Sequence, residues 1–400
     1  MDFRLTDDEE LFQKVVKEFC TKKLQPRARE IDDKEQIPED LLQEMAKLRL
    51  LGITIPEKYG GPGGSLTMAA LAAMEIAQGD ISMATVVFYL LEAGWSIIMA
   101  KYGTEEAKSD VLPQVVEGKS FLGIATTEPG GGSDLANIKT VARREGDYFV
   151  INGEKAFISG IGESQRLGSG GHLTLVRTDA AAGYRGMSFI YVPVATPGIS
   201  TLLFRDMGRM GISTGQLSYR EARVPVRYLL GEENRGFYYA MEGFNAARVL
   251  VSAACIGAAE AALNIGIDYC KRREAFGSAI AKFEGVQFEI VEQYCQIEMA
   301  KLMVLKAAWM IDNYPNPDRY TLSETTKAVS VGKLYAPQIA FETIKRAMMW
   351  YGAASYSKEN ELEMALRGVM SYMVGAEGAL NIIKVILGRE ILGREYMPYR

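Results

Sequence analysis

The hydrophobic pattern of this chain changes twice along its length, and the order of the changes limits the folds that it can adopt. Apolar side chains recur at helical spacing over residues 1–122 and again from about Gly236 onward. Between 123 and 232 the pattern becomes that of β-strands, with runs rich in β-branched and aromatic residues. A parallel α/β sheet requires strands and helices to alternate, which they do not do here. The sequence therefore predicts an α+β protein that is mainly α.

The three stretches predict three domains. An N-terminal α-helical domain should cover residues 1–122, a small β-barrel or sandwich domain residues 123–232, and a C-terminal four-helix bundle residues 233–400. The length of 400 residues agrees with this division, because one hydrophobic core seldom organises so long a chain.

Local signals predict where several elements begin and end. Thr6 and Glu9 have the spacing of a capping box, which predicts a helix start, and another helix should run from about Ser65 to Gln78. In the β region the pair Asn152-Gly153 stands between two β-rich runs, which predicts a hairpin. Long helices are predicted near 236–271, 283–313, 321–351 and 378–394.

The charge and the N-terminal segment exclude several kinds of partner. A formal net charge of -5 with a pI near 5.4 argues against capture of nucleic acid, so we expect no nucleic-acid partner. The first ten residues are acidic, unlike a secretory signal, and no segment offers about eighteen uncharged apolar residues in a row. We therefore expect a cytoplasmic protein without a membrane partner.

Cysteine and histidine, the residues typical of zinc sites, are scarce. The four cysteines are scattered without a C-x-x-C pair and His172 is the only histidine, so no metal site is predicted. His172 lies in the glycine-rich stretch RLGSGGHL and is interpreted as a surface loop residue. A Ser-His-Asp catalytic triad would have to use this one loop histidine. Acid-base chemistry must then fall to carboxylates, lysines or tyrosines.

The familiar nucleotide-binding motifs are missing from the sequence. No G-x-G-x-x-G occurs at a strand-to-helix junction, and the segment EGKS at 117–120 has Pro113 where a P-loop requires its first glycine. The segment ATTEPGGGSDLA at 125–136 predicts a different kind of site. Its three consecutive glycines let the backbone approach a flat or anionic ligand, and its hydroxyl groups can donate hydrogen bonds.

This segment and several others together resemble the acyl-CoA dehydrogenase family. The others are LTDDEELF at the start, IPEKYGG, GEKAFIS, E-x-R-V-P, RREAFG, FEGVQF and, near the C-terminus, EGALNIIKVILGREILG. The resemblance covers nearly the whole chain. It implies that an N-terminal α domain, a central β domain and a C-terminal four-helix domain enclose FAD, in a homotetramer built as a dimer of dimers.

The resemblance also implies which residues contact FAD. Ser159 would be a donor near flavin N5 with Phe157 beside the ring, and Arg273 and Phe276 would reach the phosphate and adenosine across a subunit boundary. A guanidinium suits a diphosphate because it can meet two oxygens at once. The full set of implied FAD contacts is Thr126, Thr127, Gly132, Ser133, Phe157, Ser159, Arg273, Phe276, Gln287, Gly352 and Asn381.

By the same resemblance, Ser133, Phe244, Asn245 and Arg248 are implied to lie around the acyl-CoA substrate, with Arg248 bracing the loops of the thioester channel. Glu377 is implied to be the catalytic base. It would take the α-proton of the thioester while a hydride leaves the β-carbon for the flavin, which produces the enoyl-CoA. An electron-transferring flavoprotein would accept the electrons, as in β-oxidation.

Some positions depart from the family pattern. Ala376 precedes Glu377 where tyrosine is usual, and the interval from Arg367 to the base is one residue longer, with an insertion at Gly375. Tyr351 stands where the adenine-contacting segment has glycine. These changes suggest an unusual acyl substrate or an altered affinity for the flavin.

Glu92 is a second candidate for the base. It is a lone acid in the apolar helical stretch FYLLEAGW, whose counterpart in the family lines the acyl pocket. Relatives that act on cyclic acyl-CoA thioesters place acids away from the usual position, so Glu92 would serve in such an enzyme.

Other functions also fit the sequence. An acyl-CoA oxidase or an enoyl-CoA reductase would use the same fold. A CoA-binding scaffold without flavin chemistry is a further alternative, suggested by the altered adenine segment.

Overall fold

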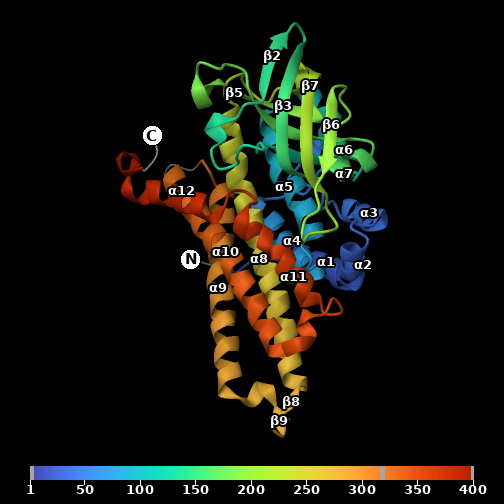
Figure 1. Ribbon diagram of the computed structural model, residues 1–400, viewed down its shortest axis with the longest axis vertical. Coiled ribbons are helices and arrows are strands. Elements are labelled where there is room, and N and C mark those ends of the chain that lie inside the picture. The colour runs from blue at the N-terminus through green and yellow to red at the C-terminus, as the bar shows by residue number, and fades with distance from the viewer. Residues whose placement is uncertain (1–3, 316–319, 398–400) are drawn as a thin grey trace.

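The computed structural model describes residues 4–315 and 320–397 of the chain. Helices come first along the chain, a curled β-sheet follows, and long helices complete the fold (Figure 1). The fold is therefore α+β and mainly α, which confirms the prediction from the order of hydrophobic periods.

The N-terminal part is a layer of helices. In the described residues these are α1 (Asp7–Phe19), α2 (Ala28–Asp33), α3 (Glu39–Lys47), α4 (Leu66–Gly79), α5 (Ala84–Tyr102) and α6 (Glu105–Val116). The predicted capping box is present at α1, because the Thr6 hydroxyl accepts from Glu9 N at 3.3 Å and Thr6 N donates to the Glu9 carboxylate at 2.8 Å. Ser65 caps α4 by accepting from Met68 N, close to the predicted start.

The central part is a seven-stranded sheet with the order β1-β4-β2-β3-β7-β6, in which β5 also pairs with β4. Its strands are β1 (Phe121–Ala125), β2 (Val141–Glu145), β3 (Tyr148–Ser159), β4 (Gly170–Arg177), β5 (Met187–Pro193), β6 (Ile199–Leu203) and β7 (Thr214–Pro225). A short helix, α7 (Ile161–Arg166), connects β3 to β4. The pairs that β4 makes with β1 and β2 are parallel and the others antiparallel, so the sheet is mixed.

The predicted hairpin at Asn152-Gly153 is wrong, because both residues lie inside the single strand β3. The turn between β2 and β3 lies at Gly146, where φ is +59°. Gly153 has φ +138° at a bulge opposite β7, and a Cβ there would lie 2.6 Å from Thr140 Cα. The Asn152 amide accepts from Glu221 N and donates to its carboxylate. Positive φ at an Asn-Gly pair serves a bulge as well as a turn.

The C-terminal part is built from long helices. They are α8 (Gly236–Arg272), α9 (Glu284–Asp312), α10 (Leu322–Tyr351), α11 (Glu361–Val374) and α12 (Leu380–Leu392), with a small hairpin of β8 (Glu274–Ala275) and β9 (Ser278–Ala279) between α8 and α9. The four predicted segments correspond to α8, α9, α10 and α12. Helix α11 was not predicted.

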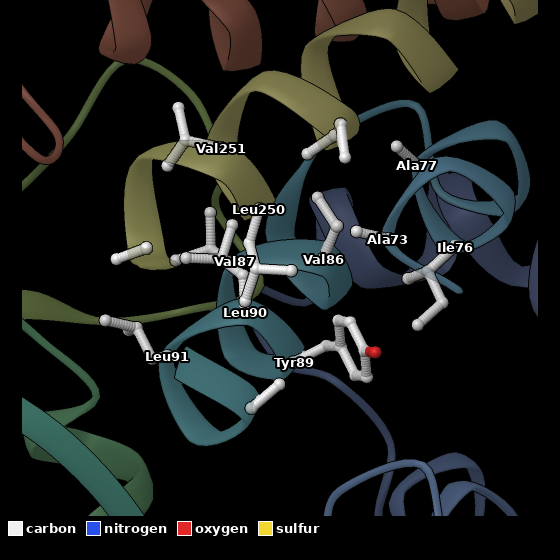
Figure 2. Close-up of a cluster of buried hydrophobic side chains, with 14 of the residues drawn as sticks. Ala73, Ile76, Ala77, Val86, Val87, Tyr89, Leu90, Leu91, Leu250 and Val251 are labelled. Carbon is white, nitrogen blue, oxygen red and sulfur yellow. The ribbon is translucent and has the colours of Figure 1, made fainter. Parts of the chain in front are cut away.

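Helix α8 forms the centre of the molecule and packs against α4, α5 and α10. Figure 2 shows Leu250 and Val251 of α8 beside Val86 and Val87 of α5. Small residues allow close contacts along α8: at Gly257 an added Cβ would lie 2.1 Å from a carbonyl oxygen of α4. Because α8 also borders β5, it connects the helical core to the sheet.

Two helices, α5 and α8, are long and apolar enough to cross a membrane by length and composition. In the folded protein 83% and 72% of their apolar windows are buried, which is the behaviour of core helices.

Candidate active site

A cleft of about 780 Å³ lies where the β domain meets α5, α8 and the connection between α11 and α12. Side chains of α5 and α8 form its inner wall. The loop after β1, residues 126–136, and the end of β3, residues 157–159, form the side toward the sheet. Residues 206–209 and 370–379 complete the lining.

Glu377 lines this cleft from the segment between α11 and α12. The backbone there is strained, with φ of +43° at Ala376 and +54° at Glu377, followed by +106° at Gly378. The left-handed conformation costs a residue with a Cβ roughly 1–2 kcal/mol, so contacts with the rest of the protein must hold this segment.

Arg248 of α8 supplies one of these contacts. Its Nε donates to the carbonyl oxygen of Glu377 at 2.9 Å, and its Nη1 donates to Asn245 Oδ1 at 3.2 Å. The guanidinium is buried and lines the cleft. Arg248 thus holds the main chain of Glu377 and leaves the carboxylate oxygens free for other contacts.

The Glu377 carboxyl is deeply enclosed by protein, although the cleft leaves the residue half-buried and in contact with solvent. Burial raises its pKa to about 7, against the opposing influence of the positive charges of Arg248 and Lys333. A carboxyl with this pKa exchanges protons near neutral pH, as a general base requires.

Six of the residues that the resemblance assigns to FAD line the same cleft as Glu377. They are Thr126, Thr127, Gly132, Ser133, Phe157 and Ser159. Gly132 packs closely on its neighbour, because an added Cβ would lie 3.0 Å from the Thr127 side chain. This wall combines hydroxyl groups with exposed backbone, as predicted from the glycine-rich segment.

A buried ion pair supports this wall, and the sequence reasoning did not find it. Lys155 of β3 is fully buried and donates to the Glu128 carboxylate at 3.0 Å and to the carbonyl oxygen of Thr126 at 3.1 Å. The Glu128 carboxylate also accepts from the backbone N–H groups of Lys139 and Thr140. The signal in the sequence was a charged residue at a buried β position, inside GEKAFIS.

Phe157 presents an apolar ring to the cleft. Its side chain is 66% exposed, its φ is +61°, and its ring lies 5.4 Å from that of Phe204. An exposed ring held in a strained backbone conformation is expected where a flat ligand stacks.

The interpretation of His172 as a surface loop residue is wrong. His172 lies in β4 with none of its surface exposed, and its Nε2 is 3.0 Å from the carbonyl oxygen of Ser159. Since a carbonyl only accepts, Nε2 carries the proton. Burial lowers the pKa of His172 to about 4, so the ring is neutral near pH 7.

Of the residues assigned to the substrate, Ser133 lies in the loop after β1, and Phe244, Asn245 and Arg248 lie on one stretch of α8. Phe244 lines the cleft, and its ring meets that of Trp95 edge-on at 5.4 Å. Asn245 does not line the cleft and contacts Arg248 instead.

The remaining residues assigned to FAD lie outside the cleft of their own chain. They are Arg273, Phe276, Gln287, Gly352 and Asn381. Phe276 is 99% exposed at the β8–β9 hairpin, which Figure 1 shows at the end of the molecule opposite the sheet. Tyr351, next to Gly352, stacks on Tyr269 with ring centres 3.8 Å apart.

Glu92 does not line the cleft, whereas Val87, Leu90 and Leu91 of the same helix do. It has no exposed surface, and among the described residues neither carboxylate oxygen has a hydrogen-bond partner. Burial raises its pKa well above the usual value.

Across the described part of the chain, no group of acidic, histidine or cysteine side chains could hold a metal ion.

Comparisons with known proteins identify the family of this chain. The chain matches the acyl-CoA dehydrogenase N-terminal domain over residues 6–119, the middle domain over 123–222 and the C-terminal domain over 234–392. It is 32% identical to the probable acyl-CoA dehydrogenase YngJ of Bacillus subtilis, over 98% of this chain and 100% of that protein. It is 34% identical to the NADH-dependent acryloyl-CoA reductase of Anaerotignum propionicum, over 98% and 97%.

Solved structures show the same architecture. Butyryl-CoA dehydrogenase from Megasphaera elsdenii superposes with a TM-score of 0.90 at 29% identity, covering 98% of this chain and 100% of that one. Because the three domain models match in order along nearly the whole chain, this protein belongs to the acyl-CoA dehydrogenase family.

Proposed function

We propose that this protein catalyses the FAD-dependent α,β-dehydrogenation of an acyl-CoA thioester to the enoyl-CoA, with Glu377 as the base. Membership of the family makes it an oxidoreductase that acts on CH–CH bonds. The observation that carries the proposal is the position of Glu377. Its carboxyl, whose pKa is about 7, lines the same cleft as Phe157 and Ser159.

The residues of the cleft account for the proton transfer. In its ionised form Glu377 can accept the α-proton, and the cleft shields the reacting carbons from bulk water. Removing that proton builds negative charge on the thioester oxygen, which backbone N–H groups of the strained 376–378 segment can stabilise. Arg248 keeps this segment in place through the Glu377 carbonyl.

FAD is the cofactor of this family, and the cleft suits it. Phe157 offers a face for a flat ring, and Thr126, Thr127 and Ser133 offer hydroxyl groups. When bound, FAD accepts the hydride from the β-carbon. A glutaryl-CoA dehydrogenase of the same fold from Mycobacterium smegmatis was solved with FADH2.

Glu377 is a better candidate for the base than Glu92. A base must reach the proton that it removes, and Glu92 lies outside the cleft with a carboxyl that burial keeps protonated. A dehydrogenase for cyclic thioesters that uses Glu92 therefore has less support.

The test is anaerobic mixing of the FAD-loaded protein with a panel of acyl-CoA thioesters. We expect the flavin absorbance to bleach with at least one straight-chain, branched or cyclic substrate. A protein that takes up FAD but is not bleached by any acyl-CoA would contradict the proposal. A colourless protein unable to take up FAD would support the scaffold alternative.

An enoyl-CoA reductase is the second candidate, because several relatives are reductases. They include the acryloyl-CoA reductase and the CarC subunit of the caffeyl-CoA reductase-Etf complex of Acetobacterium woodii, 31% identical over 97% of this chain and 99% of that protein. Re-oxidation of the reduced flavin by an enoyl-CoA, faster than the forward bleaching, would favour this direction. No feature of the cleft favours an acyl-CoA oxidase.

We also propose a cytoplasmic homotetramer, a dimer of dimers, that passes electrons to an electron-transferring flavoprotein in β-oxidation. The outward face of α9 supports association, since Phe288 is 62% and Met299 65% exposed. The exposed Phe276 and Arg273 can contribute to a cleft only in a neighbouring copy. Light scattering should give four times the chain mass of 44.1 kDa. A monomer that retains FAD would contradict the shared site. We further propose that the three domains meet near residues 122 and 232.

A further inference from the structure

Lys333 is a charged residue buried inside the C-terminal bundle. It lies on α10 with none of its surface exposed, and its ammonium donates to the carbonyl oxygen of Tyr372 at 3.0 Å. Within the described residues no carboxylate forms an ion pair with it. An ammonium buried without a direct counter-ion is costly, so its presence calls for a function.

The partner of Lys333 lies at the end of a helix. Tyr372 belongs to the last turn of α11, which ends at Val374. The last carbonyl groups of a helix have no partner within the helix, and a positive charge is favourable at this end. Lys333 therefore caps α11 from the side, and the strained segment that contains Glu377 follows directly.

Glu377 is thus held from two sides. Arg248 of α8 fixes its carbonyl oxygen, and Lys333 of α10 fixes the helix end that precedes it. The segment needs such anchors because Ala376 and Glu377 both have positive φ.

We propose that Lys333 is a positioning residue for the catalytic base, because its ammonium anchors the end of α11 that leads into Glu377 and its positive charge favours the ionised carboxylate. The inference rests on the proposed function, in which Glu377 removes the α-proton. It assigns a role to a residue that touches neither the cleft nor a ligand.

The charged and titratable groups around Lys333 and Glu377 come from several elements. Burial lowers the pKa of Lys333, Cys255 of α8 and Glu377 raise it, and Arg248 of α8 lowers it. Arg248 and Lys333 both lower the pKa of Glu377, and Arg389 of α12 lowers the pKa of Arg248. The Tyr372 hydroxyl has no hydrogen-bond partner among the described residues, and burial raises its pKa.

The positive charge of Lys333 favours the ionised form of Glu377 and so lowers its pKa. Burial lowers the pKa of Lys333 to about 8, so Lys333 is protonated over the range in which Glu377, with a pKa of about 7, titrates. Removing the positive charge must raise the pKa of Glu377, because the carboxylate loses a favourable interaction. Above about pH 8 the unmodified protein loses this charge as well, so the parent and a neutral variant should behave alike.

The experiment compares Lys333→Met with Lys333→Gln, which keeps a donor for Tyr372 without the charge. Lys327→Met, on the same helix but partly exposed, is the matched control. The carboxyl stretch of Glu377 is followed by infrared spectroscopy against pH in the FAD-loaded protein without acyl-CoA, and is identified by its loss in Glu377→Gln. We expect the pKa of Glu377 to rise by about one unit in both Lys333 variants and to stay unchanged in the control.

A second measurement follows flavin reduction. With the same shift, the rate at pH 6 should fall about tenfold in Lys333→Gln and should match the parent at pH 9. We expect Lys333→Met, which also loses the donor, to lower the pH-independent rate, and Lys333→Gln to retain it.

An unchanged Glu377 titration in folded Lys333→Gln would overturn the inference. If neither variant folds, the infrared titration of the unmodified protein tests the inference instead. The carboxylate band of Glu377 must then shift a second time near pH 8, when Lys333 loses its proton. A titration curve with a single step would overturn the inference. Since the infrared titration needs no substrate, a protein that fails to dehydrogenate any acyl-CoA would refute the proposed function without affecting this result.

Discussion

Replacing Glu377 by glutamine tests the assignment of the base, because the amide has the same size and cannot accept the proton. With its pKa at about 7, the parent carboxyl is about one tenth ionised at pH 6, half at pH 7 and nine tenths at pH 8. The rate of flavin reduction in the parent should therefore rise about tenfold from pH 6 to pH 8. In Glu377→Gln it should be lower by about 10²–10⁴-fold and should not depend on pH in this range, while FAD remains bound.

The assay is stopped-flow absorbance of the flavin after anaerobic mixing with a saturating acyl-CoA. Glu92→Gln is the matched control, since Glu92 is also a buried glutamate but lies outside the cleft. It should keep the rate and the pH profile of the parent. If Glu377→Gln reduces the flavin at the parent rate and Glu92→Gln abolishes reduction, the assignment must be reversed, and a cyclic substrate becomes the better hypothesis.

Three further variants test the surroundings of the cleft. Arg273→Ala should weaken FAD retention by about 1.5–3 kcal/mol with little effect on the rate of the loaded protein, and full flavin content after dialysis would contradict the shared site. Lys155→Met should lower the free energy of unfolding by about 3–5 kcal/mol, because the Glu128 carboxylate loses its buried partner. The thermal midpoint should rise again when Glu128→Gln is added. His172→Leu leaves the Ser159 carbonyl without its donor and should lower the thermal midpoint at pH 7. Because burial lowers the pKa of His172 to about 4, the stability it confers is present above about pH 6.5 and is lost toward pH 4, by about 3 kcal/mol at most. The difference between parent and variant should therefore narrow on acidification, and a constant difference would refute this account.

Much of the helical architecture was readable from local chemistry. Thr6 with Glu9, and Ser65 at the start of α4, satisfy backbone N–H groups that every helix start exposes, so the same pattern has the same meaning in any fold. The pair Asn152-Gly153 was misread because its local signal is ambiguous. Positive φ is needed in a turn and in a bulge, and only the pairing of β3 with β7 distinguishes them.

Other features depend on contacts between residues distant in sequence. His172 follows several glycines and looks like a loop residue, yet β4 is covered on both faces and its histidine is buried. Helix α11 escaped prediction although Asn360 caps its start. Its apolar face becomes apparent only when α8 and α10 are in place.

The residues that line the cleft were predicted better than the buried charges that stabilise its walls. Residues of the glycine-rich segment and of GEKAFIS meet Glu377 in space, as the resemblance implied, because they were named from motifs that extend over the chain. Of the supporting charges, Lys333 belongs to no motif that sequence reasoning recognised, and Lys155 lies inside GEKAFIS but was given no role. A buried lysine cannot be matched to its partner from the sequence, because the partner of each is distant along the chain.

Glu92 and Glu377 differ in the cations around them, and this difference explains why the buried cations matter for chemistry. Glu92 is fully buried, and burial raises its pKa well above the usual value, opposed by the backbone of Leu122 and by no cation. Glu377 is enclosed as well, but Arg248 and Lys333 offset part of that effect and keep its pKa at about 7. Burial without the cations would leave an acid unable to accept a proton at neutral pH, whereas the cations without burial would leave a carboxylate too weakly basic to remove a proton from carbon. A general base in this cleft would require both, and Glu377 has both.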